Sequence, residues 1–137
     1  MRTDLSVRAV HLGNMRVDVH VRDQVIPMDY PASTCTYPTP LEVLLSSLAA
    51  CAANTLHLVL SKKMGSTFDA IEVEAQAQRR EEHPTVLTGI ELIYHLHGGA
   101  LNSASLERAL RLAEDQLCPV LAMIRPGTAI TSRWQQD

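Results

Sequence analysis

The sequence predicts an α+β fold with the element order βββ-α-ββ-α-β. Several short segments alternate apolar and polar residues with the period of two that is typical of half-buried strands. Two longer segments, 40–63 and 103–117, have the composition and spacing of helices. The chain has 137 residues and no repeat or linker, so we expect a single domain over residues 1–137.

The N-terminal part of the chain predicts three strands. The clearest alternation places Met15, Val17, Val19 and Val21 against Arg16, Asp18, His20 and Arg22. An earlier strand is expected around residues 5–9, with a hairpin turn at Gly13-Asn14. A short third strand is expected at 24–28, and the proline-rich segment 30–40 predicts a loop.

A long central helix follows the loop. Thr39-Pro40-Leu41-Glu42 combines a capping residue, a proline at the first helical position and a glutamate three residues after the cap. We expect the helix to run to about Lys63 and to end at Gly65. It is apolar on nearly every face, and one chain of this length cannot cover it all round. A second copy is the expected cover, which predicts a homodimer.

The same helix raises the question of a membrane, because residues 43–60 contain no formal charge. Its polar side chains would be costly in hydrocarbon and favour a buried core helix instead. These side chains are Ser46, Ser47, Asn54, Thr55 and His57.

The second half of the chain predicts two strands, a helix and a last strand. Residues 71–77 and 90–96 alternate as strands do, and residues 128–134 have strand composition. A helix over 103–117 is predicted by a stripe of apolar residues at helical spacing, and Pro119 is expected to stop it. The stripe comprises Leu106, Ala109, Leu110, Ala113 and Leu117.

The composition excludes several classes of partner. The net charge is −3 and the basic residues are scattered, which argues against nucleic acid and anionic membrane surfaces. Aromatic residues make up only 4%, too few for a base-stacking platform. Three widely spaced cysteines are a poor disulfide framework, and residues 1–10 lack the apolar core of a signal peptide. We therefore expect a cytoplasmic protein.

Two cysteines are candidates for chemistry. Cys51 lies in the middle of the central helix, where Ser47 and Thr55 share its face. Cys118 ends the second helix, where the negative end of the dipole disfavours a thiolate and therefore suits a resolving thiol better than an attacking one. For each, the alternative is a buried structural cysteine. Cys35, in the proline-rich loop, is interpreted as an incidental surface thiol.

Histidines give no comparable signal. His95 and His97 alternate onto one strand face, but two ligands do not make a metal site, and solvent-facing side chains are the expected reading. His57 is about 120° around the helix from Cys51 and is a poor base for it. Neither a metal nor an organic cofactor is expected.

Three segments resemble the OsmC/Ohr family. Residues 38–45 running into Leu48-Ala49-Ala50-Cys51 are similar to that family's central helix, and Cys118-Pro119-Val120 is similar to its second-cysteine segment. Residues 79–84 are similar to the link found in the YhfA-type branch of OsmC-like proteins. The resemblance extends from about residue 15 to residue 134. It implies an intertwined homodimer with two active sites near the subunit interface.

The resemblance also implies a reaction. Cys51 would be the peroxidatic cysteine, whose thiolate attacks the peroxide O–O bond and becomes a sulfenic acid. Cys118 would be the resolving cysteine, which condenses with it to a disulfide that an external dithiol reduces.

In organic hydroperoxide reductases of this family, a glutamate and an arginine assist the peroxidatic cysteine. Glu42 lies nine positions before Cys51, where the family has ten, and falls about 180° away around a straight helix. Its alternative role is the capping box. The resemblance favours Arg16, because it follows the Gly13-Asn14 turn as the arginine of that family tends to, with Arg22 and Arg125 as alternatives.

The main functional hypothesis is therefore a thiol-dependent peroxidase for apolar organic hydroperoxides in oxidative-stress defence, with Leu-, Ala- and Met-rich surroundings suited to such a substrate. A second is a non-catalytic OsmC-like domain that binds a small apolar ligand or senses redox state. A third is a dimeric scaffold with inert cysteines. Peroxide turnover with a dithiol reductant distinguishes the first hypothesis from the second. Under the third hypothesis, neither Cys51 nor Cys118 would react in the native protein.

Overall fold

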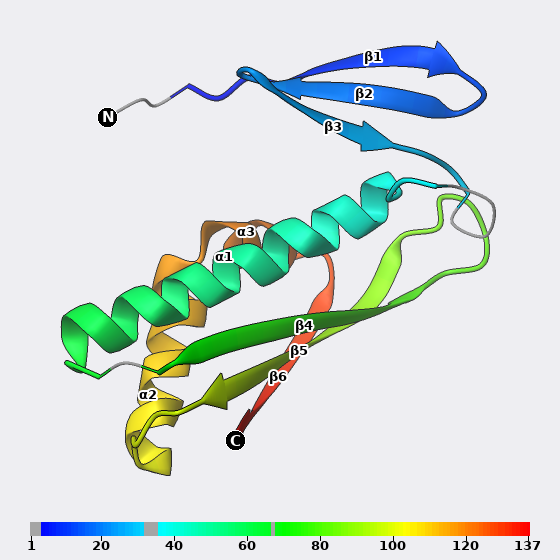
Figure 1. Cartoon of the computed structure of the whole chain (residues 1–137). Helices are drawn as coiled ribbons and strands as arrows, with labels where there is room; N and C mark the ends of the chain where they lie inside the picture. Colours follow the sequence, from blue (N-terminus) through cyan, green and yellow to red (C-terminus); the bar gives the residue numbers. More distant parts are fainter. Residues whose placement is uncertain (1–3, 32–35, 67) are drawn as a thin grey trace. The chain divides into compact units, whose positions relative to one another are not determined.

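The structure is a computed structural model that describes residues 4–31, 36–66 and 68–137. It divides into two compact units, Met1–Leu44 and Leu45–Asp137, and the central helix begins in the first and continues into the second (Figure 1). The single-domain assignment stays a prediction. Each unit is described in turn.

The first unit contains a three-stranded antiparallel sheet in the order β1-β2-β3. Its strands are β1 (Arg8–Gly13), β2 (Arg16–Val21) and β3 (Gln24–Met28). The predicted hairpin turn is confirmed: Gly13, Asn14 and Met15 all have positive φ values, of 99°, 51° and 65°. The first strand starts later than predicted, because Leu5 and Val7 precede β1 and lie exposed.

Helix α1 (Pro40–Lys63) has the predicted bounds. It starts with a capping box in which the Thr39 N–H donates to Glu42 Oε1 at 2.9 Å and the Glu42 N–H donates to Thr39 Oγ1 at 3.3 Å. Beyond its last turn, Gly65 adopts a φ of 61°, which suits a residue without a Cβ. By length and composition α1 could cross a membrane, but the core helix of a soluble protein meets the same criteria.

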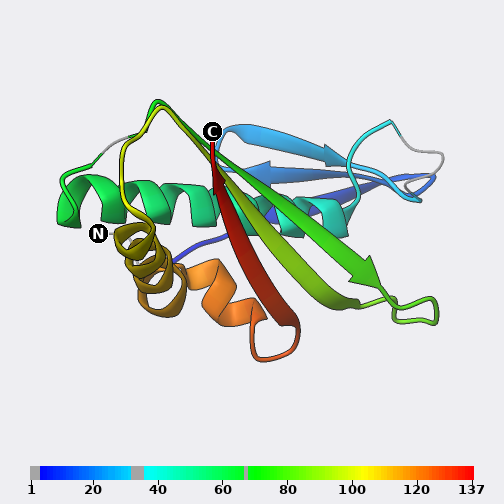
Figure 2. The same cartoon turned by 90° about the horizontal axis from the view of Figure 1, so that it is seen from below.

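The second unit is built on a three-stranded mixed sheet in the order β4-β5-β6. Strand β4 (Ala70–Arg79) pairs antiparallel with β5 (Leu87–His97), which pairs parallel with β6 (Ala129–Gln136). The parallel pair needs a crossover, and helices α2 (Ser103–Leu112) and α3 (Pro119–Ile124) provide it (Figures 1 and 2).

The hydrophobic core of this unit lies between one face of the sheet and the helices α1 and α2 (Figure 2). The residues of β5 alternate, so that every second side chain enters the core: Ile90, Leu92, Tyr94 and Leu96. Helix α1 contributes one buried stripe, namely Leu48, Ala52, Thr55, Leu56, Val59 and Leu60. The predicted α+β class is thus confirmed, and so is the predicted alternation in β4 and β5. The alternation predicted over residues 15–22 does not appear in the burial of β2, whose residues are all half-buried.

The second predicted helix is interrupted. Helix α2 ends at Leu112, the turn η1 (Ala113–Leu117) is a π-helix, and Cys118 is extended with a ψ of 104°. Pro119 does not end the helical region, as the sequence predicted, but begins α3. The physical reason is that a proline is favourable at the first position of a helix, where its missing N–H has no partner to lose.

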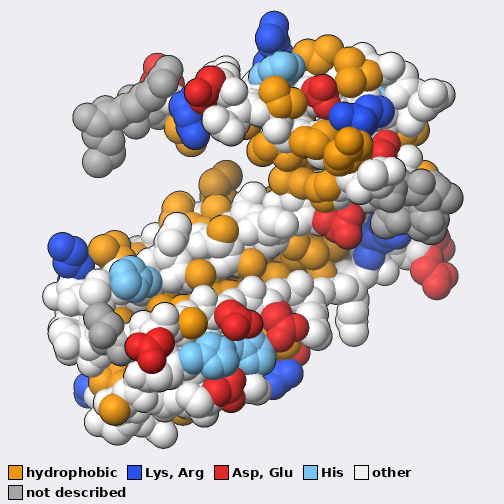
Figure 3. Space-filling model, in the orientation of Figure 1, with side chains coloured by type: hydrophobic (Ala, Val, Ile, Leu, Met, Phe, Trp, Pro, Cys, Tyr) orange, Lys and Arg blue, Asp and Glu red, His pale blue; other side chains and the backbone are white. Residues whose placement is uncertain are grey.

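The opposite face of the sheet is polar. Figure 3 shows histidine side chains beside carboxylates on this surface, which Glu72, Glu74, His95 and His97 supply from β4 and β5. One side of the sheet thus faces the core and the other carries charge, which is the usual pattern of an antiparallel pair.

Candidate active site at the cysteine pair

The structure brings Cys51 and Cys118 together. Their sulfur atoms lie 3.2 Å apart, with the Cys118 thiol donating toward Cys51, and both cysteines are free. A disulfide requires about 2.05 Å between the sulfurs, so an approach of roughly 1 Å would join them. Cys35 falls among residues 32–35, outside the described part of the chain.

Cys51 sits on α1 at the edge of the core, half-buried, one residue before the buried Ala52. The predicted neighbour Thr55 is one turn away: its hydroxyl donates to the Cys51 carbonyl at 2.7 Å and lies 4.0 Å from the sulfur. A small polar group therefore adjoins the Cys51 sulfur at the edge of the apolar core.

Cys118 is 2% exposed and lies between η1 and α3. Its N–H donates to the Ala113 carbonyl at 2.9 Å. Burial raises the pKa of the Cys118 thiol, the nearby Leu121 N–H opposes this, and Cys51 raises it further. The Cys118 thiol is therefore protonated at neutral pH.

The predicted position of Cys118 at a helical C-terminus is confirmed, but it is incomplete. Cys118 is the C-cap of η1, and because α3 begins at the next residue it is also the N-cap of α3. The negative end of one helical segment and the positive end of the other therefore both adjoin the thiol, and their effects on a thiolate oppose each other. Burial of the sulfur raises the pKa of the Cys118 thiol, which is the effect that the sequence led us to expect from the helix dipole.

A polar cluster near Cys118 was missed by the sequence reasoning. Glu114, in η1, accepts two hydrogen bonds: from the Tyr94 hydroxyl to Oε2 at 2.8 Å and from the Ser132 hydroxyl to Oε1 at 3.0 Å. Tyr94 is 1% exposed, and burial, followed by the charge of Glu114, raises its pKa far above the usual range. The sequence did contain one sign of this cluster. Tyr94 occupies a core-facing position of a predicted strand, and a buried hydroxyl needs a hydrogen-bond partner.

Glu42 caps helix α1, which was one of the two roles predicted for it. Its carboxylate accepts from both the N–H and the hydroxyl of Thr39, at 2.9 and 3.0 Å. These hydrogen bonds, the backbone one first, lower the pKa of Glu42. Its role in catalysis stays a prediction.

The favoured arginine, Arg16, begins β2. Its guanidinium lies 3.2 Å from Asp18 Oδ1 and stacks over the Tyr37 ring, 4.2 Å from the centroid. Its Nε is buried and has no hydrogen-bond partner within the described residues. Arg16 and Glu42 belong to the first unit, and the two cysteines belong to the second.

The alternative arginines have other surroundings. Arg22 lies in the turn after β2, with a φ of 56°. Arg125, at the end of α3, forms an ion pair with Asp115 at 3.0 Å and is largely exposed. Neither observation assigns the activating cation.

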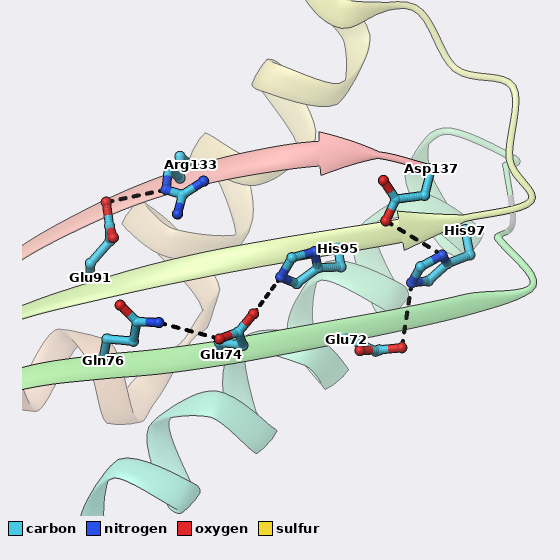
Figure 4. Close-up of polar contacts among 8 residues, drawn as sticks. All are labelled: Glu72, Glu74, Gln76, Glu91, His95, His97, Arg133 and Asp137. Atoms are coloured by element: carbon cyan, nitrogen blue, oxygen red, sulfur yellow. Dashed lines mark hydrogen bonds and ion pairs between the residues drawn. The ribbon is translucent and has the colours of Figure 1, made fainter.

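The strand histidines are engaged with carboxylates on the polar face of the sheet (Figure 4). His95 contacts Glu74 at 2.6 Å, and His97 lies 3.4 Å from Glu72 and 3.7 Å from Asp137. Over residues 4–31, 36–66 and 68–137, no group of three or more His, Cys, Asp or Glu side chains is arranged to hold a metal ion.

Comparison with known proteins identifies the family. The model of the OsmC-like protein family matches residues 33–133. Protein YhfA of Escherichia coli K12 is 31% identical over 98 residues, which cover 72% of each chain.

Solved structures agree with this assignment at the level of the fold. An OsmC-like protein from Mycoplasma pneumoniae matches with a TM-score of 0.89 and 20% identity over 99% of both chains. The organic hydroperoxide resistance protein OhrB of Bacillus subtilis matches with a TM-score of 0.73 and 17% identity over 96% of this chain and 98% of that one. The extent of the family match and the identity to YhfA together show that this chain belongs to the OsmC/Ohr family.

Proposed function

We propose that the protein is a thiol-dependent peroxidase that reduces organic hydroperoxides through Cys51 and Cys118. The observation that carries this proposal is the 3.2 Å separation of the two free sulfur atoms. Two thiols held at this distance can exchange between a dithiol and a disulfide without rearrangement of the fold.

The proposed reaction has three steps. The Cys51 thiolate attacks the distal oxygen of ROOH, the O–O bond breaks, and the alkoxide takes up a proton to leave as ROH. Cys51 is oxidised to a sulfenic acid. The Cys118 sulfur then attacks the Cys51 sulfur, which releases water and forms the disulfide. An external dithiol returns both cysteines to thiols by disulfide exchange.

The surroundings of the two sulfurs support this division of roles. The first step needs a thiolate that peroxide can reach, and Cys51 is the less buried of the two. Cys118 is almost fully buried with a raised pKa, so it is protonated at neutral pH and serves as the second thiol. The apolar side chains around the pair favour an organic substrate over a strongly hydrated one.

Family membership supports the reaction class. The Bacillus subtilis structure with this fold is an organic hydroperoxide resistance protein, whereas the name of the Escherichia coli relative states no activity. We infer from the family resemblance that Arg16 activates Cys51 and that Glu42 assists it in an intertwined homodimer. A cytoplasmic location, where dithiol reductants are abundant, fits this chemistry.

Coupled turnover tests the proposal. The protein is incubated with cumene hydroperoxide and dithiothreitol, and peroxide consumption is followed for the wild type, Cys51→Ser and Cys118→Ser. We expect catalytic consumption by the wild type, none above background for Cys51→Ser, and faster reaction with cumene hydroperoxide than with hydrogen peroxide. Equal background rates for all three proteins would rule out the peroxidase; a disulfide formed without turnover would instead indicate a redox sensor.

A further inference from the structure

The segment that carries Cys118 is tied to the sheet by a half-buried carboxylate, that of Glu114. We propose that Tyr94, Glu114 and Ser132 form a positioning unit that holds Cys118 within reach of Cys51 for disulfide formation. This inference rests on the proposed two-cysteine reaction and assigns these residues to its second step.

The geometry of Glu114 is suited to this task. It lies in η1, four positions before Cys118, and each of its carboxylate oxygens is bound by a hydroxyl from a different strand. Tyr94 comes from β5 and Ser132 from β6, so the carboxylate fixes η1 against two neighbouring strands of the sheet. Hydrogen bonds to a carboxylate are stronger than those between neutral groups, and burial of Tyr94 shields this one from water.

The segment itself needs such a tie. A π-helical turn is rare and has weaker internal support than an α-helix, and it is often found at functional sites. Cys118 follows η1 directly and leaves the helical conformation, with its N–H bound to the Ala113 carbonyl. Among the described residues, one ion pair involves a side chain of η1: Asp115 contacts Arg125 at the end of α3, and this ion pair is exposed.

The tie is close to Cys118 along the chain. The Cys118 N–H donates to the carbonyl of Ala113 at 2.9 Å, and Ala113 directly precedes Glu114 in η1. Sulfenic acid formation at Cys51 uses neither Cys118 nor the tie. Condensation of the sulfenic acid with Cys118 requires the roughly 1 Å approach of the two sulfurs and therefore depends on how η1 is held.

The variants Tyr94→Phe and Glu114→Ala test the inference. Tyr94→Phe keeps the buried ring and removes only the hydroxyl, so it serves if Glu114→Ala fails to fold. The matched control is Glu107→Ala, because Glu107 on α2 also accepts a hydrogen bond from an aromatic side chain of the sheet, Trp134 Nε1 at 2.5 Å. The control removes a strand-to-helix hydrogen bond that is made by α2 and not by η1.

Two rates are measured after rapid mixing with one equivalent of cumene hydroperoxide. Sulfenic acid is trapped with dimedone, and disulfide is quantified by mass spectrometry after acid quench. We expect sulfenic acid formation within about twofold of the wild type in every variant. Disulfide closure should slow about tenfold in Tyr94→Phe and Glu114→Ala, because misplacement of a reacting group by about 1 Å is costly, and should be unchanged in Glu107→Ala.

A second measurement needs no peroxide. In buffers of oxidised and reduced dithiothreitol, the midpoint of the Cys51–Cys118 disulfide should shift about tenfold toward the dithiol in Glu114→Ala but not in Glu107→Ala. This readout keeps the inference testable if sulfenic acid never forms, an outcome that would overturn the proposed function alone. Wild-type closure rates and midpoints in Tyr94→Phe and Glu114→Ala, or equal slowing in Glu107→Ala, would overturn the positioning unit.

Discussion

The sulfur atoms of Cys51 and Cys118 lie 3.2 Å apart, although the two residues are separated by 67 positions in the chain. Helix α1 supplies one and the junction of η1 with α3 supplies the other. The two sulfurs differ in environment, since Cys118 is buried with a raised pKa and Cys51 is half-buried. This asymmetry leads to separate expectations for each cysteine.

Alkylation of the reduced native protein should distinguish the two thiols. At pH 7.5, iodoacetamide should modify Cys51 before Cys118, because burial blocks access to Cys118 and the raised pKa keeps its thiol protonated. Peptide mapping at successive times measures the order, and the selectivity should disappear in denaturant. Faster modification of Cys118 in the native protein would reverse the proposed roles.

Replacement of the second thiol should stop the reaction at its intermediate. In Cys118→Ser, one equivalent of cumene hydroperoxide should produce a sulfenic acid on Cys51 that persists and adds dimedone stoichiometrically. Cys51→Ser provides the matched control and should add none. Intact mass measures both, and dimedone addition at Cys118 in the Cys51→Ser variant would show that Cys118 is the thiol that peroxide oxidises.

The arginine assignment is tested by a pair of matched variants. Arg16→Met should lower kcat/KM for cumene hydroperoxide about 100-fold, the usual effect of removing one charge-stabilising donor. Arg22→Met, in the turn after β2, should stay near the wild type. Steady-state rates with dithiothreitol give both values. The reverse pattern would assign the activating role to Arg22. Unchanged rates in both variants would show that neither arginine activates Cys51.

The helix cap predicts a dependence of stability on pH. Thr39 lowers the pKa of Glu42, so this carboxylate stabilises the fold above its unfolded pKa of about 4.3, and the contribution is lost as the pH falls through the lower folded value. Wild type should therefore exceed Glu42→Gln in denaturant midpoint at pH 7, and the difference should narrow toward pH 3. A constant difference between the two proteins across this range would contradict the ionised cap.

Local patterns allowed much of the fold to be predicted. The capping box at Thr39 and Glu42 acts within one turn of the chain, and the strand alternation records which face is buried, so both are visible in sequence. The break at Cys118 was not, because Pro119 can either end a helix or begin one, and packing decides between them.

The candidate site was less accessible to sequence reasoning. The family resemblance implied that Cys51 and Cys118 meet, but their spacing alone does not, since their distance depends on how α1 and α2 pack on the sheet. The partnership of Tyr94 with Glu114 joins residues 20 positions apart through the tertiary fold, and no local pattern in either segment specifies it.

The central claim is tested most directly by the intact mass of the reduced protein after brief exposure to one equivalent of cumene hydroperoxide, followed by peptide mapping. The two-cysteine peroxidase predicts a loss of two hydrogens within seconds, mapped to a bridge between Cys51 and Cys118. An unchanged mass with both thiols still free would contradict it.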